Sequence, residues 1–180
     1  MKTSLEGALI SLFAFACGTG SSDPAPTAPS LDVAGDHRVV ESVSGSGSFI
    51  VSTQEGDWRT FGFTARRYAD GTVEGEWERV RRLDGDAAGT SAHGFVTCFT
   101  VIGNEAWVGG IATGGIYAEP PNNGIAFRVQ DNGEGANAAG RDRMSLEYVQ
   151  LLPSQPLSYC QFHPDRPGFF DLEAGNVQIR

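Results

Sequence analysis

AHGFVTCFTVIGNEAWVGGIAT, residues 92–113, is predicted to form two long strands joined by a tight turn at Gly103 and Asn104. Glycine in the first place of a two-residue loop favours a type II′ hairpin turn. The predicted cross-strand pairs are Ile102 with Glu105, Val101 with Ala106, Phe99 with Val108, and Val96 with Ile111. We therefore expect an antiparallel hairpin at the centre of the fold.

Both faces of this hairpin are largely apolar, because side chains alternate along a strand. One face carries Phe95, Thr97, Phe99 and Val101, and the other carries Val96, Cys98, Thr100 and Ile102. The first face sets large residues against Ala106, Gly110 and Ala112, as in an interdigitated core layer, and is predicted to lie inside. The opposite face includes Trp107 and Ile111 and is too apolar to stay bare, so we expect another segment to cover it.

A second hairpin is predicted in TFGFTARRYADGTVEGEW, residues 60–77. A two-residue loop at Asp70 and Gly71 would place Phe63 opposite Glu78. A three-residue loop over 69–71 instead pairs Phe63 with Trp77, Ala65 with Gly75, and Arg66 with Glu74. The second register is favoured because it puts the aromatic rings in the core and Glu74, Glu76 and Glu78 in solvent. A cation-binding or anion-repelling stripe is the alternative interpretation of these glutamates.

The remaining alternating segments extend the antiparallel pattern. Strands are expected at 37–43 and 48–53, separated by the glycine-serine stretch 44–47, and at 125–130, 144–148 and 176–180. The irregular segment 153–172 is the predicted cover of the central hairpin, with Phe162 and its neighbours over Trp107 and Ile111. About nine short strands indicate an all-β fold, an antiparallel barrel or a sandwich. The barrel is favoured because the central strands are apolar on both faces.

The first residues are typical of a secretory signal, with an apolar run over 8–16 that is too short to span a bilayer. Ala14-Phe15-Ala16 suits an ordinary signal peptidase, and together with Cys17-Gly18 it resembles the bacterial lipobox. Both interpretations place cleavage before Cys17, and lipidation of Cys17 is favoured because it explains a cysteine at this position. We predict a signal peptide (1–16), a Pro/Ser-rich tether (17–30) and one β-barrel-like domain (31–180). The chain is expected to be exported, either anchored in the cell envelope through Cys17 or secreted.

Cys98 and Cys160 are the two cysteines that remain after Cys17. In an exported domain the default for such a pair is a disulfide, and buried free thiols are the alternative. A bridge between these positions would stabilise the fold by about 4 kcal/mol in the chain-entropy model.

The formal net charge of −9 disfavours nucleic acid as a partner. Lys2 is the only lysine, so Schiff-base and P-loop lysine chemistry is excluded on the mature chain. No standard catalytic signature occurs.

Two polar groups are candidate sites. His93 beside Ser91, oriented by Asp131 or Glu134, is the one hydrolase-like assembly, although a histidine at a strand start is also a common rim residue. Asp131, Glu134 and Asp142 supply oxygen ligands suited to calcium, whereas Asx-turn chemistry explains the same loop without a metal. No cofactor is expected otherwise.

Trp58, Trp77 and Tyr68 are candidate ligand-binding residues at a barrel mouth, with a filled interior as the alternative. We therefore expect an exported β-domain with a binding or structural role and an unidentified protein or small-molecule partner. The alternative is an envelope enzyme, a hydrolase or isomerase, or a small-ligand-binding barrel with its site at one end.

A series of short motifs resembles a group of uncharacterised secreted bacterial all-β domains, in particular those that follow a choice-of-anchor P module. The motifs are GSGSF (45–49), the 60–77 hairpin, SAHGFVTCFTVIGNEAW (91–107), VQDNGEGAN (129–137) and AGNVQIR (174–180). The resemblance implies an exported all-β domain of unknown activity, and it brings no catalytic residues.

Overall fold

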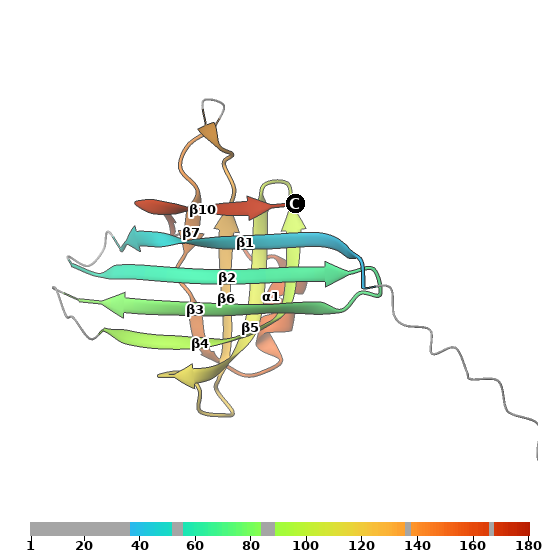
Figure 1. Ribbon diagram of the computed structural model, residues 1–180. Coiled ribbons are helices and arrows are strands. Elements are labelled where there is room, and N and C mark those ends of the chain that lie inside the picture. Colours follow the sequence, from blue (N-terminus) through green and yellow to red (C-terminus); the bar gives the residue numbers. More distant parts are fainter. Residues whose placement is uncertain (1–36, 52–55, 84–88, 136–137, 166–167) are drawn as a thin grey trace, which may run out of the picture. The chain divides into compact units, whose positions relative to one another are not determined.

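Antiparallel strands form most of the chain in the computed structural model, which describes residues 37–51, 56–83, 89–135, 138–165 and 168–180 (Figure 1). The strands are β1 (Val39–Ile50), β2 (Trp58–Tyr68), β3 (Val73–Arg82), β4 (Thr90–Ile102), β5 (Glu105–Gly115), β6 (Gly124–Gln130), β7 (Arg143–Ser145), β8 (Tyr148–Leu151), β9 (Phe169–Asp171) and β10 (Ala174–Ile179). They form one sheet in the order β10-β1-β2-β3-β4-β5-β6-β7-β9, with β8 also paired to β6. The all-β prediction is confirmed, whereas the predicted signal peptide, Cys17 and the tether lie outside the described residues.

The sheet curls into two layers that cross at a steep angle (Figure 1). The first layer comprises β10, β1, β2, β3 and the beginning of β4. The second layer comprises the rest of β4 with β5, β6 and the short strands beyond them. The central hairpin bends from one layer into the other. The core lies between the layers and includes Phe49, Phe63, Phe99, Val108 and Phe127, all nearly inaccessible to solvent.

A β-bulge accompanies this bend, as is usual where a strand changes layer. The pairs Ile102–Glu105, Val101–Ala106 and Phe99–Val108 are confirmed. Val96 then pairs with Gly110 rather than Ile111, because Thr97 is the extra residue of the bulge. The predicted inner face is therefore correct after Thr97 and wrong before it: Phe95 points outward and is 55% exposed, while Val96 is buried.

The pairing of β2 with β3 agrees with the predicted hairpin over residues 60–77. Phe63–Trp77, Ala65–Gly75 and Arg66–Glu74 are paired as predicted, and Tyr68 N–H donates to the Thr72 carbonyl across the three-residue loop.

The predicted break at 44–47 is wrong, because β1 runs through it without interruption. A Cβ on Gly47 would lie 2.3 Å from the Ala174 carbonyl oxygen, so only glycine allows β10 to approach this closely. The glycines are on the inner side of β1 and the serines on the outer side. The predicted strand 144–148 is also divided, into β7 and β8, which both pair with β6.

The cover over the second layer is a helix, α1 (Gln155–Phe162), within the segment predicted to be irregular. It packs against β4, β5 and β6. Its sequence lacks a clear apolar stripe, and its only strong signal is a proline in the first turn. The Cys98–Cys160 disulfide is confirmed and joins α1 to β4. Among the described residues, no helix is long and apolar enough to cross a bilayer.

Trp107 is covered as predicted by neighbours of Phe162, but not by Phe162 itself. Its ring packs in a cluster with Tyr159 and lies edge-on to His163, with 5.4 Å between ring centroids. Its Nε1 donates to the Pro164 carbonyl at 3.2 Å. Phe162 is 78% exposed, so the prediction that it buries Trp107 is wrong.

Candidate functional site

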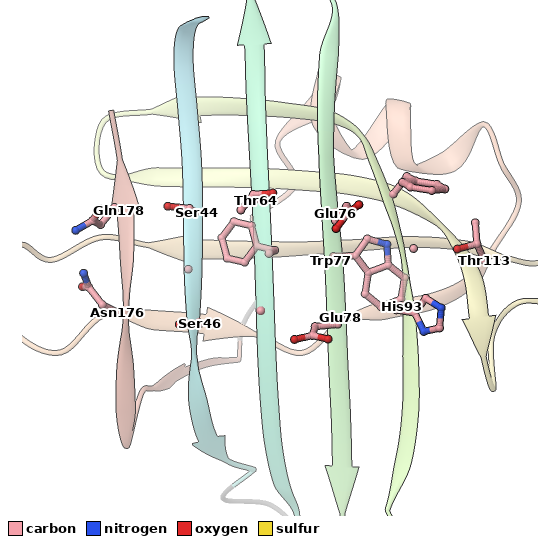
Figure 2. Close-up of a pocket in the computed structure, with 15 residues that line it drawn as sticks. Ser44, Ser46, Thr64, Glu76, Trp77, Glu78, His93, Thr113, Asn176 and Gln178 are labelled. Atoms are coloured by element: carbon pink, nitrogen blue, oxygen red, sulfur yellow. The ribbon is translucent and has the colours of Figure 1, made fainter.

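The outer face of the first layer carries an open hollow across β10, β1, β2, β3 and β4, with a volume of about 810 Å³ (Figure 2). We call this hollow the trough. It is lined by Ser44, Gly45, Ser46, Gly62, Phe63, Thr64, Glu76, Trp77, Glu78, His93, Gly94, Phe95, Thr113, Asn176 and Gln178. Sequence reasoning singled out Trp77 and His93 as site residues and gave a cation-binding or anion-repelling stripe as the alternative for Glu76 and Glu78, but it did not combine these residues in one site.

Strand register explains how the trough is assembled. Two rows of outward residues cross the layer: Gln178, Ser44, Thr64, Glu76 and Phe95 form one, and Asn176, Ser46, Gly62, Glu78 and His93 form the other. In both rows the residues on β1 and β2 are small, and those on β10, β3 and β4 have longer side chains. The trough is therefore a consequence of side-chain size on a regular sheet.

The floor of the trough is a lane of small polar residues. The outward positions of β1 are all serine over Ser42, Ser44, Ser46 and Ser48, and β2 adds Thr60, Gly62 and Thr64. Figure 2 shows Ser44, Ser46 and Thr64, which belong to this lane and line the trough, between Asn176 and Gln178 on one side and the glutamates on the other. A polymer lying on this lane would meet a hydroxyl group at each second residue of β1 and, on β2, at Thr60 and Thr64.

One wall is acidic and the other carries amides. Glu76 and Glu78 project from β3, and no arginine or lysine lines the trough. On β10, the amides of Asn176 and Gln178 donate to Oε1 of Glu134 at 2.8 and 2.7 Å. These hydrogen bonds, that of Gln178 first, hold the pKa of Glu134 below its ordinary value. Glu134 thus fixes the amide wall from outside the trough.

The imidazole of His93 lies directly against the backbone of Gly114. A Cβ at Gly114 would lie 2.1 Å from His93 Cε1, so any larger residue would displace the ring. Within the described part of the chain, no hydrogen bond or ion pair to another protein group occupies the side chains of Glu76, Glu78 or His93. These three groups are available to a ligand.

Two further hollows continue the outer face along β2. One, of about 560 Å³, includes Tyr68 and shares Thr64, Glu76 and Phe95 with the trough. The other, of about 240 Å³, lies beside Trp58. Trp58 and Tyr68 are ten residues apart on one strand, which corresponds to about 33 Å.

The sequence predicts that Trp58, Trp77 and Tyr68 meet at one barrel mouth. In the structure they do not meet. Trp77 belongs to the core and is 4% exposed, while Trp58 is 43% exposed. All three nevertheless border hollows of the same outer face.

The predicted hydrolase-like assembly is not formed. Ser91 and His93 both point outward from β4, but Glu134 lies beside β10 at the opposite wall. Four strand-to-strand steps, about 19 Å, separate β4 from β10. Asp131 does not approach His93 either, because its Oδ2 accepts a hydrogen bond from the backbone of Ile179 at 3.0 Å.

The carboxylates of the predicted calcium loop hold backbone groups. Asp131 accepts from Gly133 N, the Asx-turn arrangement, and Asp142 accepts from Asn132 N and Val177 N. These contacts join the loop to β10. Among the described residues, no three His, Cys, Asp or Glu side chains are arranged to hold a metal ion.

The sequence analysis did not predict a buried ionic cluster at one end of the core. Asp57, fully buried, accepts from Arg59 Nε at 2.9 Å and from Arg81 Nη2 at 3.0 Å. Arg59 also reaches Glu147 at 3.3 Å, which links the first layer to the segment between β7 and β8. Burial raises the pKa of Asp57, but the hydrogen bonds and charges of Arg59 and Arg81 outweigh it and hold that pKa below its ordinary value.

The cluster could have been anticipated from the second hairpin. Arg79 and Arg81 share the inward parity of Trp77 on β3, and Arg59 shares that of Phe63 on β2. Inward arginines need buried acidic partners. The partner Glu147 is distant in sequence, so only the fold reveals it.

No family model, curated protein or solved structure matches this chain. The resemblance to secreted bacterial β-domains stays a prediction, and the function has to be argued from the trough itself.

Proposed function

We propose that this protein is an exported cell-envelope binding domain and that the trough is its ligand-binding surface. The observation that carries the proposal is a hollow of about 810 Å³ that crosses five strands and is lined by polar side chains. Concave sites that present a few convergent polar groups beside aromatic side chains are typical of ligand recognition.

Export and anchoring form part of this proposal. The disulfide is compatible with an oxidising compartment, and the first residues resemble a lipoprotein signal. A lipid on Cys17 would hold the domain at a membrane through the tether, and release without a lipid is the alternative. The acidic wall of the trough argues against nucleic acid as the ligand.

A hydrolytic role is the second candidate, and the positions of two carboxylates favour it. Glu76 and Glu78 point outward from alternate positions of one strand, which sets their Cα atoms about 7 Å apart. Most glycoside hydrolases likewise use a pair of Asp or Glu carboxyl groups beside the scissile bond. His93 lies opposite Glu78 and supplies a third titratable group.

Co-sedimentation with cell-envelope material tests the binding role. The full chain carries Cys17→Ser, so that a lipid cannot bring it down. It is mixed with membrane and cell-wall fractions of the producing cell and compared with two further variants in the same background. Ser46→Phe fills the trough from its exposed floor, and Ser158→Phe makes the same change on the exposed surface of α1.

The parent chain and Ser158→Phe are expected to sediment with the envelope material, and Ser46→Phe is expected to stay in solution. Equal sedimentation of all three proteins, or of none, would contradict the proposed binding surface. Breakdown of the bound material by the parent chain, lost in Glu76→Gln and Glu78→Gln, would instead establish the hydrolytic role.

A further inference from the structure

We infer that the ligand of the trough is a glycan chain, uncharged or cationic, that lies along β1 and β2. The inference rests on the proposed binding role of the trough and specifies the chemical class that this surface recognises.

Hydrogen-bonding capacity is the first argument. Serine and threonine hydroxyls both donate and accept, side-chain amides do the same through separate atoms, and carboxylates only accept. The floor provides the first type through Ser44, Ser46 and Thr64, and the acidic wall provides acceptors. Sugar hydroxyls can donate and accept, so they can satisfy the floor and the wall at once.

Backbone pairing argues against an extended peptide. A bound peptide strand needs the free N–H and C=O groups of a sheet edge. Here β1, β2 and β3 are each paired on both sides, so the floor of the trough presents side chains without free backbone groups. On the end strand β10, the N–H groups of Val177 and Ile179 already donate to Asp142 and Asp131. A ligand in this position must be recognised through side chains.

The negative charge of the glutamates limits which glycan can bind. Glu76 and Glu78 line one wall, and Glu74 continues their row into the neighbouring hollow. In the trough itself, a phosphate-bearing or uronic-acid chain would meet Glu76 and Glu78, and the described lining holds no basic side chain to offset the repulsion. Arg66, the cross-strand partner of Glu74, lines the neighbouring hollow instead. A neutral chain, or one with amino groups, avoids that cost.

Aromatic side chains and length favour a chain over a single sugar. Phe95 is 55% exposed beside the trough, and Trp58 is 43% exposed at the end of the lane. An exposed ring offers an apolar face on which the C–H groups of a sugar can pack. From Trp58 to Thr64 the lane is about 20 Å long, which gives room for several sugar units in line.

Competition in the sedimentation assay tests the ligand class. The envelope fraction is separated into a polysaccharide pool, digested with protease and freed of lipid, and into protein and lipid pools. The polysaccharide pool is expected to reduce sedimentation of the Cys17→Ser chain at least tenfold. Fragments of several sugar units should act at a lower concentration than single sugars.

Two substitutions make this test specific for the trough. Phe95→Ala is expected to weaken competition-sensitive binding about tenfold. Ile102→Ala, a similarly exposed position at the other end of β4, should have no effect. Competition by the protein or lipid pool alone, with the effect of Ser46→Phe retained, would overturn the glycan and keep the binding surface. Loss of the Ser46→Phe effect would overturn both.

Discussion

The outer faces of the two layers are built in opposite ways. The second layer carries Trp107 and Cys98 outward, and these are covered by α1, which is held by a disulfide. Arg128 adds to this cover, with its guanidinium 4.1 Å from the Phe169 ring centroid and 5.5 Å from that of Trp107. The first layer carries serine, threonine, glutamate and amide side chains, and its outer face is hollowed instead of covered.

This difference shows where the chain needs a cover. Apolar outward residues on the second layer must be removed from water, so the helix completes the core. Small polar residues on the first layer need no cover, and their shortness leaves room for a ligand. The two faces should therefore respond differently to substitution: stability should depend on the covered face, and binding on the open one.

Removal of the disulfide should have the largest effect on stability. Cys98→Ala with Cys160→Ala opens a loop of sequence separation 62, and the free energy of unfolding should fall by about 4 kcal/mol. Urea unfolding of the oxidised parent and the double variant measures this loss. At urea concentrations well below the unfolding midpoint, the double variant should bind envelope material as the parent does. A folded double variant that no longer binds would show that the covered face controls the open one.

Asp57→Asn should be the next largest change, because Asp57 connects the inward arginines of the first layer. Its replacement leaves Arg59 and Arg81 without their shared buried carboxylate and should cost about 3 kcal/mol or more. Denaturant unfolding at neutral pH measures the loss. Asp171→Asn, which removes an exposed partner of Arg143, is the control and should change stability by less than about 1 kcal/mol.

The same contact gives a pH dependence. The folded-state pKa of Asp57 lies below the ordinary value of 3.8, so its stabilising contribution is complete above that pH. It is lost as the pH falls through the folded-state pKa. Asp57→Asn should therefore flatten the fall in stability below pH 3.8. If the stability of the variant falls as steeply at low pH as that of the parent, other carboxylates control acid unfolding.

Gly47→Ala and Ser48→Ala compare the inner and outer sides of a single strand. The alanine Cβ at position 47 would meet the Ala174 carbonyl at 2.3 Å, and the resulting shift should cost about 2 kcal/mol. Ser48 points outward, so its change should stay within about 0.5 kcal/mol. Thermal unfolding of both variants measures the difference. Equal losses would mean that the outer serines contribute to the fold as well as to the lane.

Local patterns were enough to predict much of the sheet. Turn chemistry at Gly103 fixed one hairpin, and the choice of loop at Gly71 fixed the other, because only one register put Phe63 opposite Trp77. The Cys98–Cys160 pair followed from cysteine number. Each of these features depends on neighbouring residues or on one forced pairing.

The errors arose where a long-range contact overrides the local pattern. Ser44 to Gly47 has the composition of a linker, but β2 and β10 pair with it on both sides and make it a central strand. The trough combines side chains from β1 and β10, at opposite ends of the described sequence, so no local motif could predict it. The helix α1 forms on a surface that exists only after the sheet has folded.

The final comparison concerns Phe95 and Val96, neighbours that the bulge at Thr97 assigns to opposite faces. Phe95→Ala should lower stability by less than about 1 kcal/mol, since the ring is 55% exposed. Val96→Ala empties part of the core and should cost about 2 kcal/mol, although the residue removed is smaller. Binding should show the reverse order, with Phe95→Ala the more harmful.

Urea unfolding of Phe95→Ala and Val96→Ala ranks their losses of stability, and the envelope assay ranks their losses of binding. A larger stability loss for Phe95→Ala would contradict the position of the bulge, because the inner face would then continue unbroken along β4. Val96→Ala weakening binding more than Phe95→Ala would instead place the ligand away from this wall of the trough. Agreement on both would show that one inserted residue, Thr97, gives the open face its exposed aromatic ring.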